Sequence, residues 1–243
     1  MKSDKGNSAL SPGTADYVAA AAKSAVGAVP FVGSLLVEIA GTIIPYQRID
    51  RIAKFAACLE SRLNALETLY VKEQLENEAF TDLLEEGLRQ AGRSLSNERR
   101  EYIASLISQS LNTEDIDYQE SKHLLQILGE LNDIEIIWLR YFVGSAIGGD
   151  HDFQETHKPV LTSVVPTLAS PPNEVDKAAL QESYKDHLAR LGLLTKQYVI
   201  DLHTKKPEFD EFNRTYKMGG YELTELGRLL LKQIGLASDE NAL

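Results

Sequence analysis

Residues 187–203 read HLARLGLLTKQYVIDLH, and in this stretch the chain changes from a helical to an extended pattern. The sequence predicts a helix from about Glu174 to Arg190 that ends at Gly192, because glycine adopts the left-handed conformation after a helix most easily. The segment QYVIDLH that follows is rich in β-branched and aromatic residues and predicts a strand. A helix that passes directly into a strand is therefore expected here.

The residues after this strand predict that the chain turns back on itself. After a charged turn, the run NRTYKMGGYEL (213–223) predicts a return strand, and its Gly-Gly pair suits a β-bulge. Thr224 is a good N-cap for a terminal helix over 225–236. Helix, hairpin and helix in this order are typical of the tail of a winged helix. We therefore predict a small α+β, winged-helix-like module over 174–236.

Charge bears on whether such a module binds DNA or protein. The chain has 25 Lys and Arg against 36 Asp and Glu, and its formal charge of -11 repels phosphate backbones unless cations cluster locally. The helix predicted from Glu174 to Arg190, which would be the recognition helix of a winged helix, has three cations and four acids. The predicted hairpin, which would be the wing, has four cations and four acids. The predicted wing contacts are Lys205, Lys206, Arg214 and Lys217. We expect a structural or protein-contact module, with DNA as the less favoured target.

The remaining sequence divides by its periodicity. Apolar residues recur every three or four positions through most of 24–147, which predicts a multi-helix bundle. The stretch 148–173 contains four prolines and no sustained period, so it predicts a linker or loop. A flexible N-terminus is expected over 1–23 and a disordered tail over 237–243. The predicted fold class is mainly α, with the bundle followed by the winged-helix-like module.

A long uncharged run near the start of the chain is bracketed by Pro30 and Pro45. A helix in this bracket would reach only about 21 Å at about 1.5 Å per residue, whereas the bilayer core is about 30 Å thick. The spacing predicts an amphipathic helix with an apolar face, so a simple transmembrane anchor is disfavoured. Either the face packs in a soluble bundle, or it contacts membrane or a partner after a rearrangement. Its candidate contact residues are Phe31, Leu35, Leu36, Ile39 and Ile43.

The sequence contains no recognisable catalytic motif, and we predict no catalytic residue, no cofactor and no metal. The loop DHDFQETH (150–157) has metal-binding residue types, but their spacing matches no defined site, which favours a solvated loop. His123 and His187 are expected to be surface or hydrogen-bonded core residues rather than general bases. Cys58, the single cysteine, is expected to be a packed side chain in a reducing compartment. An enzyme with an unrecognised site near the acidic loop is the remaining alternative.

Three segments resemble the abortive-infection alpha (Abi-alpha-like) family of bacterial proteins. They are PFVGSLLVEIAGTIIPYQRIDRIAKF, the central run from REYIASLISQSL to IEIIWLRYF, and HLARLGLL with YELTELGRLLL. The resemblance implies a phage-defence protein whose activation harms or arrests the host cell, and it supplies no catalytic residues. It implies a cytoplasmic protein or one held peripherally at the inner membrane.

Two function classes follow from these observations. The first is a non-enzymatic anti-phage effector or interaction protein that acts on a protein partner, a second copy or a membrane. The alternative is a soluble regulator that binds protein or DNA through the winged helix. Nucleic acid is a disfavoured partner, and no small-molecule substrate is evident.

Overall fold

A computed structural model describes residues 49–63, 66, 68–111, 116–144, 150–167, 169–211 and 214–236. The predicted helix between Pro30 and Pro45 lies outside these residues, and its apolar face stays a prediction. The described part of the chain is mainly helical, which confirms the predicted class. The chain forms two compact units, Met1–Leu125 and Gln126–Leu243, and each is described by itself.

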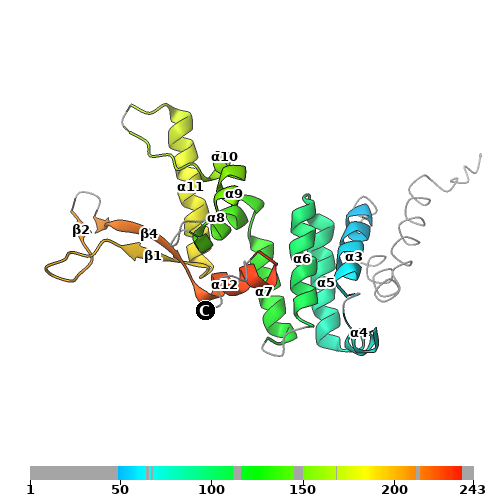
Figure 1. Cartoon of the computed structure of the whole chain (residues 1–243). Coiled ribbons are helices and arrows are strands. Elements are labelled where there is room, and N and C mark those ends of the chain that lie inside the picture. The colour runs from blue at the N-terminus through cyan, green and yellow to red at the C-terminus, as the bar shows by residue number, and fades with distance from the viewer. Residues whose placement is uncertain are drawn as a thin grey trace, which may run out of the picture. The chain divides into compact units, whose positions relative to one another are not determined.

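The first unit is a helical bundle, as predicted. Its helices are α3 (Ile49–Leu63), α4 (Thr68–Leu75), α5 (Glu78–Arg93), α6 (Asn97–Gln109) and the first part of α7 (Tyr118–Glu130). Helices α3, α5 and α6 lie side by side (Figure 1). The residues buried in this bundle include Ile52, Phe55, Leu59, Leu63, Phe80, Leu83, Leu84, Leu88, Ile103, Leu106 and Ile107. Their spacing of three or four along each helix gives one apolar stripe per helix, which explains the packing.

Two features fix the geometry inside this bundle. The side chain of Asn77 accepts hydrogen bonds from the N–H groups of Ala79 and Phe80, and that of Ser96 accepts one from Arg99, so α5 and α6 both begin with a side-chain cap. Gly87 lets α5 approach α6 closely, because an added Cβ would lie 2.3 Å from Cδ1 of Ile107.

The second unit combines helices with short strands. Its elements, besides the end of α7, are α8 (Asp133–Gly144), α9 (His151–Thr156), α10 (Lys158–Leu161), α11 (Pro172–Arg190), β1 (Leu194–Tyr198), β2 (Phe209–Asp210), β3 (Thr215–Tyr216), β4 (Met218–Leu223) and α12 (Glu225–Gln233). Helix α8 contacts α10, α11, α12 and β4 and so forms the centre of this unit. The residues buried in this second unit include Leu139, Leu188, Leu193, Leu194, Leu223, Leu230 and Leu231.

The stretch predicted as a linker or loop contains two short helices, α9 and α10. The side chain of Asp150 caps α9 by accepting the Phe153 N–H at 3.0 Å, and Pro159 stands in the first turn of α10, where its missing N–H costs nothing. The following residues are fixed to α11 by buried Gln181. Its amide donates to the Thr162 carbonyl at 2.8 Å and accepts the Val164 N–H at 3.1 Å. One helix cap, one proline in a first turn and one buried amide therefore support structure in a proline-rich segment that lacks periodicity.

The passage from α11 to β1 follows the prediction. Gly192 has φ +76°, its N–H bonds to the Ala189 carbonyl, and the Leu193 N–H bonds to the Leu188 carbonyl, which together form a Schellman motif. Thr224 caps α12 by accepting the Gly227 N–H at 3.0 Å, as predicted. Among the described residues, no helix is long and apolar enough to cross a bilayer.

Candidate interaction surface

The strands after α11 form a branched structure that we call the fork, defined as residues 194–223. Its stem is the antiparallel pair of β1 and β4, with Leu194 opposite Leu223 and Gln197 opposite Gly220. The register shifts by one residue before Tyr198, which pairs with Met218 and leaves Gly219 as the extra residue. This is the predicted bulge. Gly220 has φ +147°, a conformation open to glycine but rarely to other residues.

The stem divides at a three-way backbone junction. The Val199 N–H donates to the Lys217 carbonyl at 2.9 Å, the Lys217 N–H to the Glu208 carbonyl at 2.8 Å, and the Glu208 N–H to the Val199 carbonyl at 2.8 Å. Each of the three residues donates to one neighbour and accepts from the other. The junction therefore satisfies its own backbone groups at the point where the ladder splits.

Two hairpins leave this junction, whereas the sequence predicted one. The first turns at 201–206 and closes with a bridge between Ile200 and Pro207, and the second is the β2–β3 pair, between which Glu211 and Arg214 are described. The predicted strand QYVIDLH overlaps β1 only at Gln197 and Tyr198, because β1 begins earlier, at Leu194, and ends at Tyr198. The Asp201 side chain accepts the N–H groups of His203 and Thr204 and starts the first turn.

One face of the fork is apolar. Tyr198 and Met218 are cross-strand partners, and so are Phe209 and Tyr216, while Ile200 and Pro207 form the bridge. Partners across a ladder share a face, as do residues two apart on a strand, so these pairs project to the same side. The ring centroids of Tyr198 and Tyr216 lie 6.0 Å apart and those of Phe209 and Tyr216 lie 5.4 Å apart, both edge to face.

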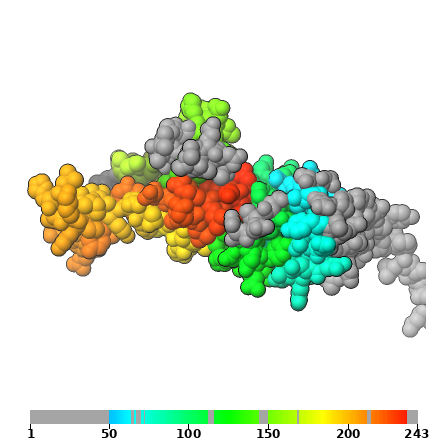
Figure 2. Space-filling view, turned by 60° about the horizontal axis from the view of Figure 1, so that its bottom comes forward, coloured from blue at the N-terminus to red at the C-terminus, as the bar shows by residue number. Residues whose placement is uncertain are grey.

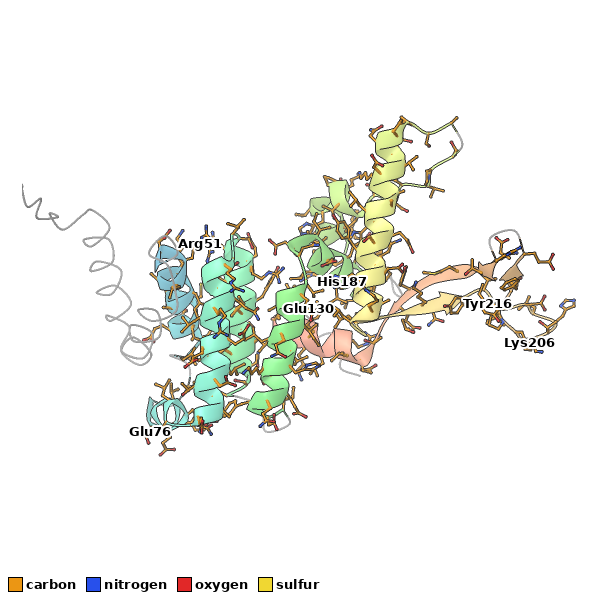
Figure 3. All side chains as sticks on the ribbon, turned by 180° about the vertical axis from the view of Figure 1, so that it is seen from behind. Arg51, Glu76, Glu130, His187, Lys206 and Tyr216 are labelled. Atoms are coloured by element: carbon orange, nitrogen blue, oxygen red, sulfur yellow. The ribbon has the colours of Figure 1, made fainter. Side chains whose placement is uncertain are left out.

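This apolar face is open to solvent. Tyr198, Ile200, Phe209, Tyr216 and Met218 are 38–52% exposed, and Pro207 is exposed as well. The opposite side of the fork carries an ion pair between Lys217 and Glu208 at 2.8 Å. In Figure 2 the outer part of the fork projects beyond the helices of its own unit on the side shown, and Figure 3 places Tyr216 and Lys206 in this outer part, away from α11. The fork is therefore amphipathic, with its apolar side uncovered by any described element.

The four cations predicted as wing contacts have different surroundings. The hydrogen bond with Glu208 raises the pKa of Lys217 and engages it within the fork. The side chains of Lys205, Lys206 and Arg214 have no ion-pair or hydrogen-bond partner in the described part of the chain. Lys205 has φ +55° and Arg214 has φ +54°, so each turn holds a long cation in the left-handed region, where glycine is usual.

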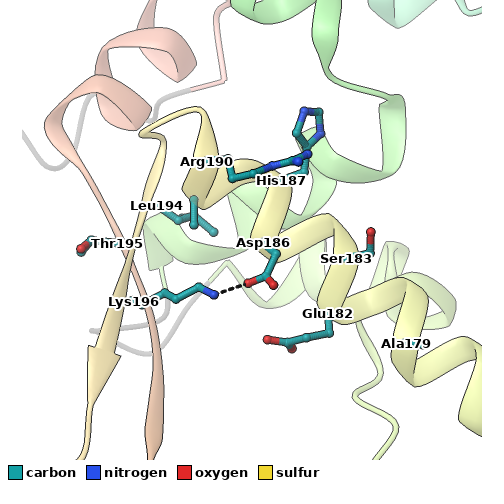
Figure 4. A pocket seen from close by; sticks show the side chains of 10 residues that line it. Ala179, Glu182, Ser183, Asp186, His187, Arg190, Leu194, Thr195 and Lys196 are labelled. Carbon is teal, nitrogen blue, oxygen red and sulfur yellow. Dashed lines mark ion pairs between the residues drawn. The ribbon is translucent and has the colours of Figure 1, made fainter. Parts of the chain in front are cut away.

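A polar network ties the stem of the fork to α11. The Tyr221 hydroxyl lies 2.6 Å from Glu182 Oε1 and 2.6 Å from Asp186 Oδ1, and Lys196 pairs with Asp186 at 2.7 Å (Figure 4). Hydrogen bonds from Lys196 and then Tyr221 lower the pKa of Asp186. Burial alone would raise the pKa of Glu182, but hydrogen bonds from Lys185 and Tyr221 bring it below its usual range. Burial and the two carboxylates raise the pKa of Tyr221, so the phenol stays protonated and shares one proton between both acceptors.

This network borders a cleft between α11 and β1. The cleft has a volume of about 810 Å³, and its lining includes Ser183, Arg190 and Thr195 besides the charged groups of the network. Lys185 also lies 5.7 Å from the centroid of the Trp138 ring and 5.5 Å from that of Tyr221. Most of the charged groups that line this cleft form hydrogen bonds or ion pairs with one another. Such pairing is typical of a contact that holds two elements together rather than of a binding site.

The remaining candidate residues have structural surroundings. His187 Nδ1 lies 2.7 Å from Oε1 of buried Glu135, whose other oxygen accepts the Asn132 N–H, so this histidine links α11 to α8. Asp150 pairs with Arg140 at 2.8 Å. In the described ranges no group of three or more His, Cys, Asp or Glu could hold a metal ion.

Cys58 is close to an acidic and a basic side chain. Its thiol lies 3.2 Å from Glu101, which also pairs with Arg62 at 3.1 Å. Burial and this carboxylate raise the pKa of Cys58 to about 11. The thiol is therefore protonated at neutral pH and a poor nucleophile.

Sequence reasoning located the cations of the fork but missed its apolar face. The available signal was the spacing of two between Tyr198 and Ile200, Pro207 and Phe209, and Tyr216 and Met218. The predicted contacts Phe31, Leu35, Leu36, Ile39 and Ile43 lie outside the described residues. Comparisons of the chain with protein-family models, with curated proteins and with solved structures found no match.

Proposed function

We propose that this chain is a non-enzymatic interaction protein of the abortive-infection type, which acts by docking the apolar face of the fork on another protein surface. The observation that carries the proposal is the set of six apolar residues on one uncovered side of the fork. Exposed apolar surface of this kind, with polar residues at its rim, is typical of protein contact sites. The resemblance of the sequence to the Abi-alpha-like family supplies the setting of phage defence.

The size of this face sets how much of the binding free energy it can supply. Complete burial of a large apolar side chain contributes about 1.5–3 kcal/mol. Because these side chains are already about half buried, covering all six would contribute roughly 5–9 kcal/mol. Association itself costs about 4–15 kcal/mol, so a partner must add apolar surface or charge pairs of its own.

Charge favours protein over DNA as the partner. The fork contains the cations Lys196, Lys205, Lys206, Arg214 and Lys217 and the acids Asp201, Glu208, Asp210, Glu211 and Glu222, so its formal charge is zero. Phosphate backbones bind to surfaces with a clear excess of cations. A winged-helix-like module that contacts protein is consistent with this balance.

The proposal is tested by phage challenge of bacteria that express the chain. The test variant combines Phe209→Asp with Tyr216→Asp, which places charge in the apolar face. The control is Val199→Asp, because Val199 lies between Tyr198 and Ile200 on the strand and projects to the other side. We expect the wild-type chain and the control to reduce plaque formation and the double variant to lose this protection.

Protein level and circular dichroism establish that each variant is present and folded. Full protection by the double variant would refute a role for the apolar face, and no protection by the wild-type chain would refute the phage-defence setting. A membrane role for residues 30–45 has a separate test: co-flotation with liposomes of the intact chain, compared with a Leu35→Asp/Ile39→Asp variant.

A further inference from the structure

We propose that Met218 is an oxidation site that controls the apolar face of the fork. Hydrogen peroxide converts its thioether to a sulfoxide, and the sulfoxide prevents docking. The oxidation itself follows from the surroundings of the two described sulfur atoms. Its effect on docking rests on the proposed function, because it concerns the same face, and it adds a form of regulation to that function.

Met218 places a thioether within the apolar face. It pairs with Tyr198 across the stem and follows Tyr216 by two residues. The residue is 38% exposed, and no described element covers this face, so a small oxidant in solution reaches the side chain. The next two residues, Gly219 and Gly220, have no side chains that could shield it. Oxidation would therefore place a polar group in the apolar face.

Cys58, the competing sulfur, is protected. A cysteine reacts with peroxide through its thiolate. Burial and Glu101 raise the pKa of Cys58 to about 11, so only about one thiol in ten thousand is ionised at pH 7. A thioether has no proton to lose, and its lone pair is available at every pH. Peroxide should therefore oxidise Met218 before Cys58, although an ordinary exposed cysteine is the more reactive of the two residue types.

The reaction needs only the peroxide and the side chain. The sulfur lone pair of Met218 attacks one peroxide oxygen, the O–O bond breaks, an S–O bond forms, and the other oxygen leaves as water. Sulfur loses two electrons and the peroxide gains them. Reversal needs two electrons and two protons from a dithiol, which becomes a disulfide while the sulfoxide oxygen leaves as water. The modification is therefore reversible in a reducing compartment.

The sulfoxide oxygen would be a strong hydrogen-bond acceptor inside a contact. An apolar partner surface that covers it would leave this acceptor without a donor, which weakens binding by about tenfold or more. The fold should not change, because the stem and the junction are held by backbone hydrogen bonds in which the sulfur takes no part. Oxidation of Met218 would therefore act on docking and not on stability.

Peptide mapping of the full chain after exposure to hydrogen peroxide tests the oxidation. Trypsin places Met218 in the peptide 218–228 and Cys58 in the peptide 55–62. We expect one added oxygen on Met218 while Cys58 stays open to alkylation. In urea the pKa of Cys58 returns from about 11 to its ordinary value of 9.0, so about a hundredfold more thiolate forms and Cys58 should be oxidised first. Oxidation of Cys58 first in the folded chain, or an unmodified Met218, would overturn the inference.

Retention on a phenyl matrix measures the apolar face without any partner. Peroxide treatment should make the wild-type chain elute earlier. The control is Met218→Leu, which keeps the apolar surface, cannot be oxidised at this position and should elute unchanged. Equal shifts of both chains would trace the effect to another residue and overturn the inference.

A phage challenge tests the effect on docking. Met218→Gln carries a permanent polar group of about the size of the sulfoxide and should allow about tenfold more plaques than the wild-type chain. Met218→Leu should protect like the wild-type chain. Equal protection by the two variants would mean that a polar group at this position does not prevent docking.

Failure of this inference can be told apart from failure of the proposed function. If Met218→Gln protects fully while Phe209→Asp/Tyr216→Asp does not, the apolar face docks but Met218 does not control it. If both variants protect fully, the proposed function is wrong, whatever peptide mapping shows for Met218.

Discussion

The bundle of the first unit and the fork of the second use similar side chains in opposite ways. Phe55 and Phe80 are 0% exposed among α3, α5 and α6, whereas Phe209 and Tyr216 on the fork are 52% and 50% exposed. In the bundle an aromatic ring stabilises the fold through burial and close packing. On the fork the backbone is held by its own junction and stem, so the rings are free to contact something else. The same residue type therefore supports stability in one region and contact in the other.

The largest predicted effect compares one phenylalanine from each region. Phe80→Ala should reduce the free energy of unfolding by about 3–5 kcal/mol, because it opens a cavity in the bundle. Phe209→Ala should change it by less than about 1 kcal/mol, because half of the ring is already in water. Chemical denaturation followed by far-UV circular dichroism measures both. Equal losses would mean that the fork also depends on its aromatic residues for stability, and the contrast would disappear.

Two glycines give a second comparison between the units. An added Cβ at Gly227 would lie 2.4 Å from the Leu193 carbonyl oxygen, which is backbone, whereas at Gly87 the obstacle is Cδ1 at the flexible end of Ile107. Gly227→Ala should therefore destabilise its unit by about 1–3 kcal/mol. In Gly87→Ala the strain should be largely offset by the roughly 1 kcal/mol better helix propensity of alanine.

Separate probes can follow these two variants. Trp138, the single tryptophan, lies in the second unit, so its fluorescence reports on Gly227→Ala. Far-UV circular dichroism reports on Gly87→Ala through the helices of the first unit. A larger loss of stability for Gly87→Ala than for Gly227→Ala would show that the side chains of the bundle adjust less easily than the backbone at Leu193.

The two regions also differ in how far their sequences predicted them. A stripe with a period of 3.6 encodes a buried helix face, so residues such as Ile52, Phe55 and Leu59 could be assigned to the core from spacing alone. The fork could not be derived in this way. The residues 211–214, which join β2 to β3, include neither glycine nor proline, and the left-handed positions 205 and 214 hold cations instead of the expected glycine.

The junction and the interaction surface were harder to predict for a related reason. Three backbone hydrogen bonds among Val199, Glu208 and Lys217 create the branch. Because almost every residue type has the same backbone groups, the sequence does not indicate such bonds. The alternation of apolar residues was readable, but a strand pattern does not say whether its apolar side is covered. The helix at His151–Thr156 was missed because it depends on one cap, Asp150, and on no periodicity.

The polar network between α11 and the stem of the fork should contribute a stability that depends on pH. The pKa values of Glu182 and Asp186 are lowered in the folded chain, so these groups add stability above their unfolded pKa values, which is lost as the pH falls through the folded ones. Tyr221→Phe removes a donor to both and should cost about 1 kcal/mol or less near neutral pH, because the carboxylates are half exposed and screened. The difference from the wild-type chain should vanish in acid.

Tyr216→Phe is the matched control for this measurement, since the Tyr216 hydroxyl has no hydrogen-bond partner among the described residues. Unfolding followed by Trp138 fluorescence from about pH 7 down to about pH 2 covers the carboxylate range. If Tyr221→Phe loses the same stability at every pH, the phenol acts through packing and not through the two carboxylates.

The smallest predicted effect concerns the two left-handed turn residues and bears most directly on the contrast between the regions. Lys205→Gly and Arg214→Gly relieve backbone strain, while glycine also adds freedom to the unfolded chain, so the stability should stay equal or rise by up to about 1 kcal/mol. Thermal denaturation measures this change, and phage challenge measures the protection that the same variants give. Unchanged or higher stability together with weaker phage protection would mean that the cations occupy strained positions for contact with a partner. Lower stability would mean that these residues support the fold itself, and the turns would then resemble the bundle more than a displayed surface.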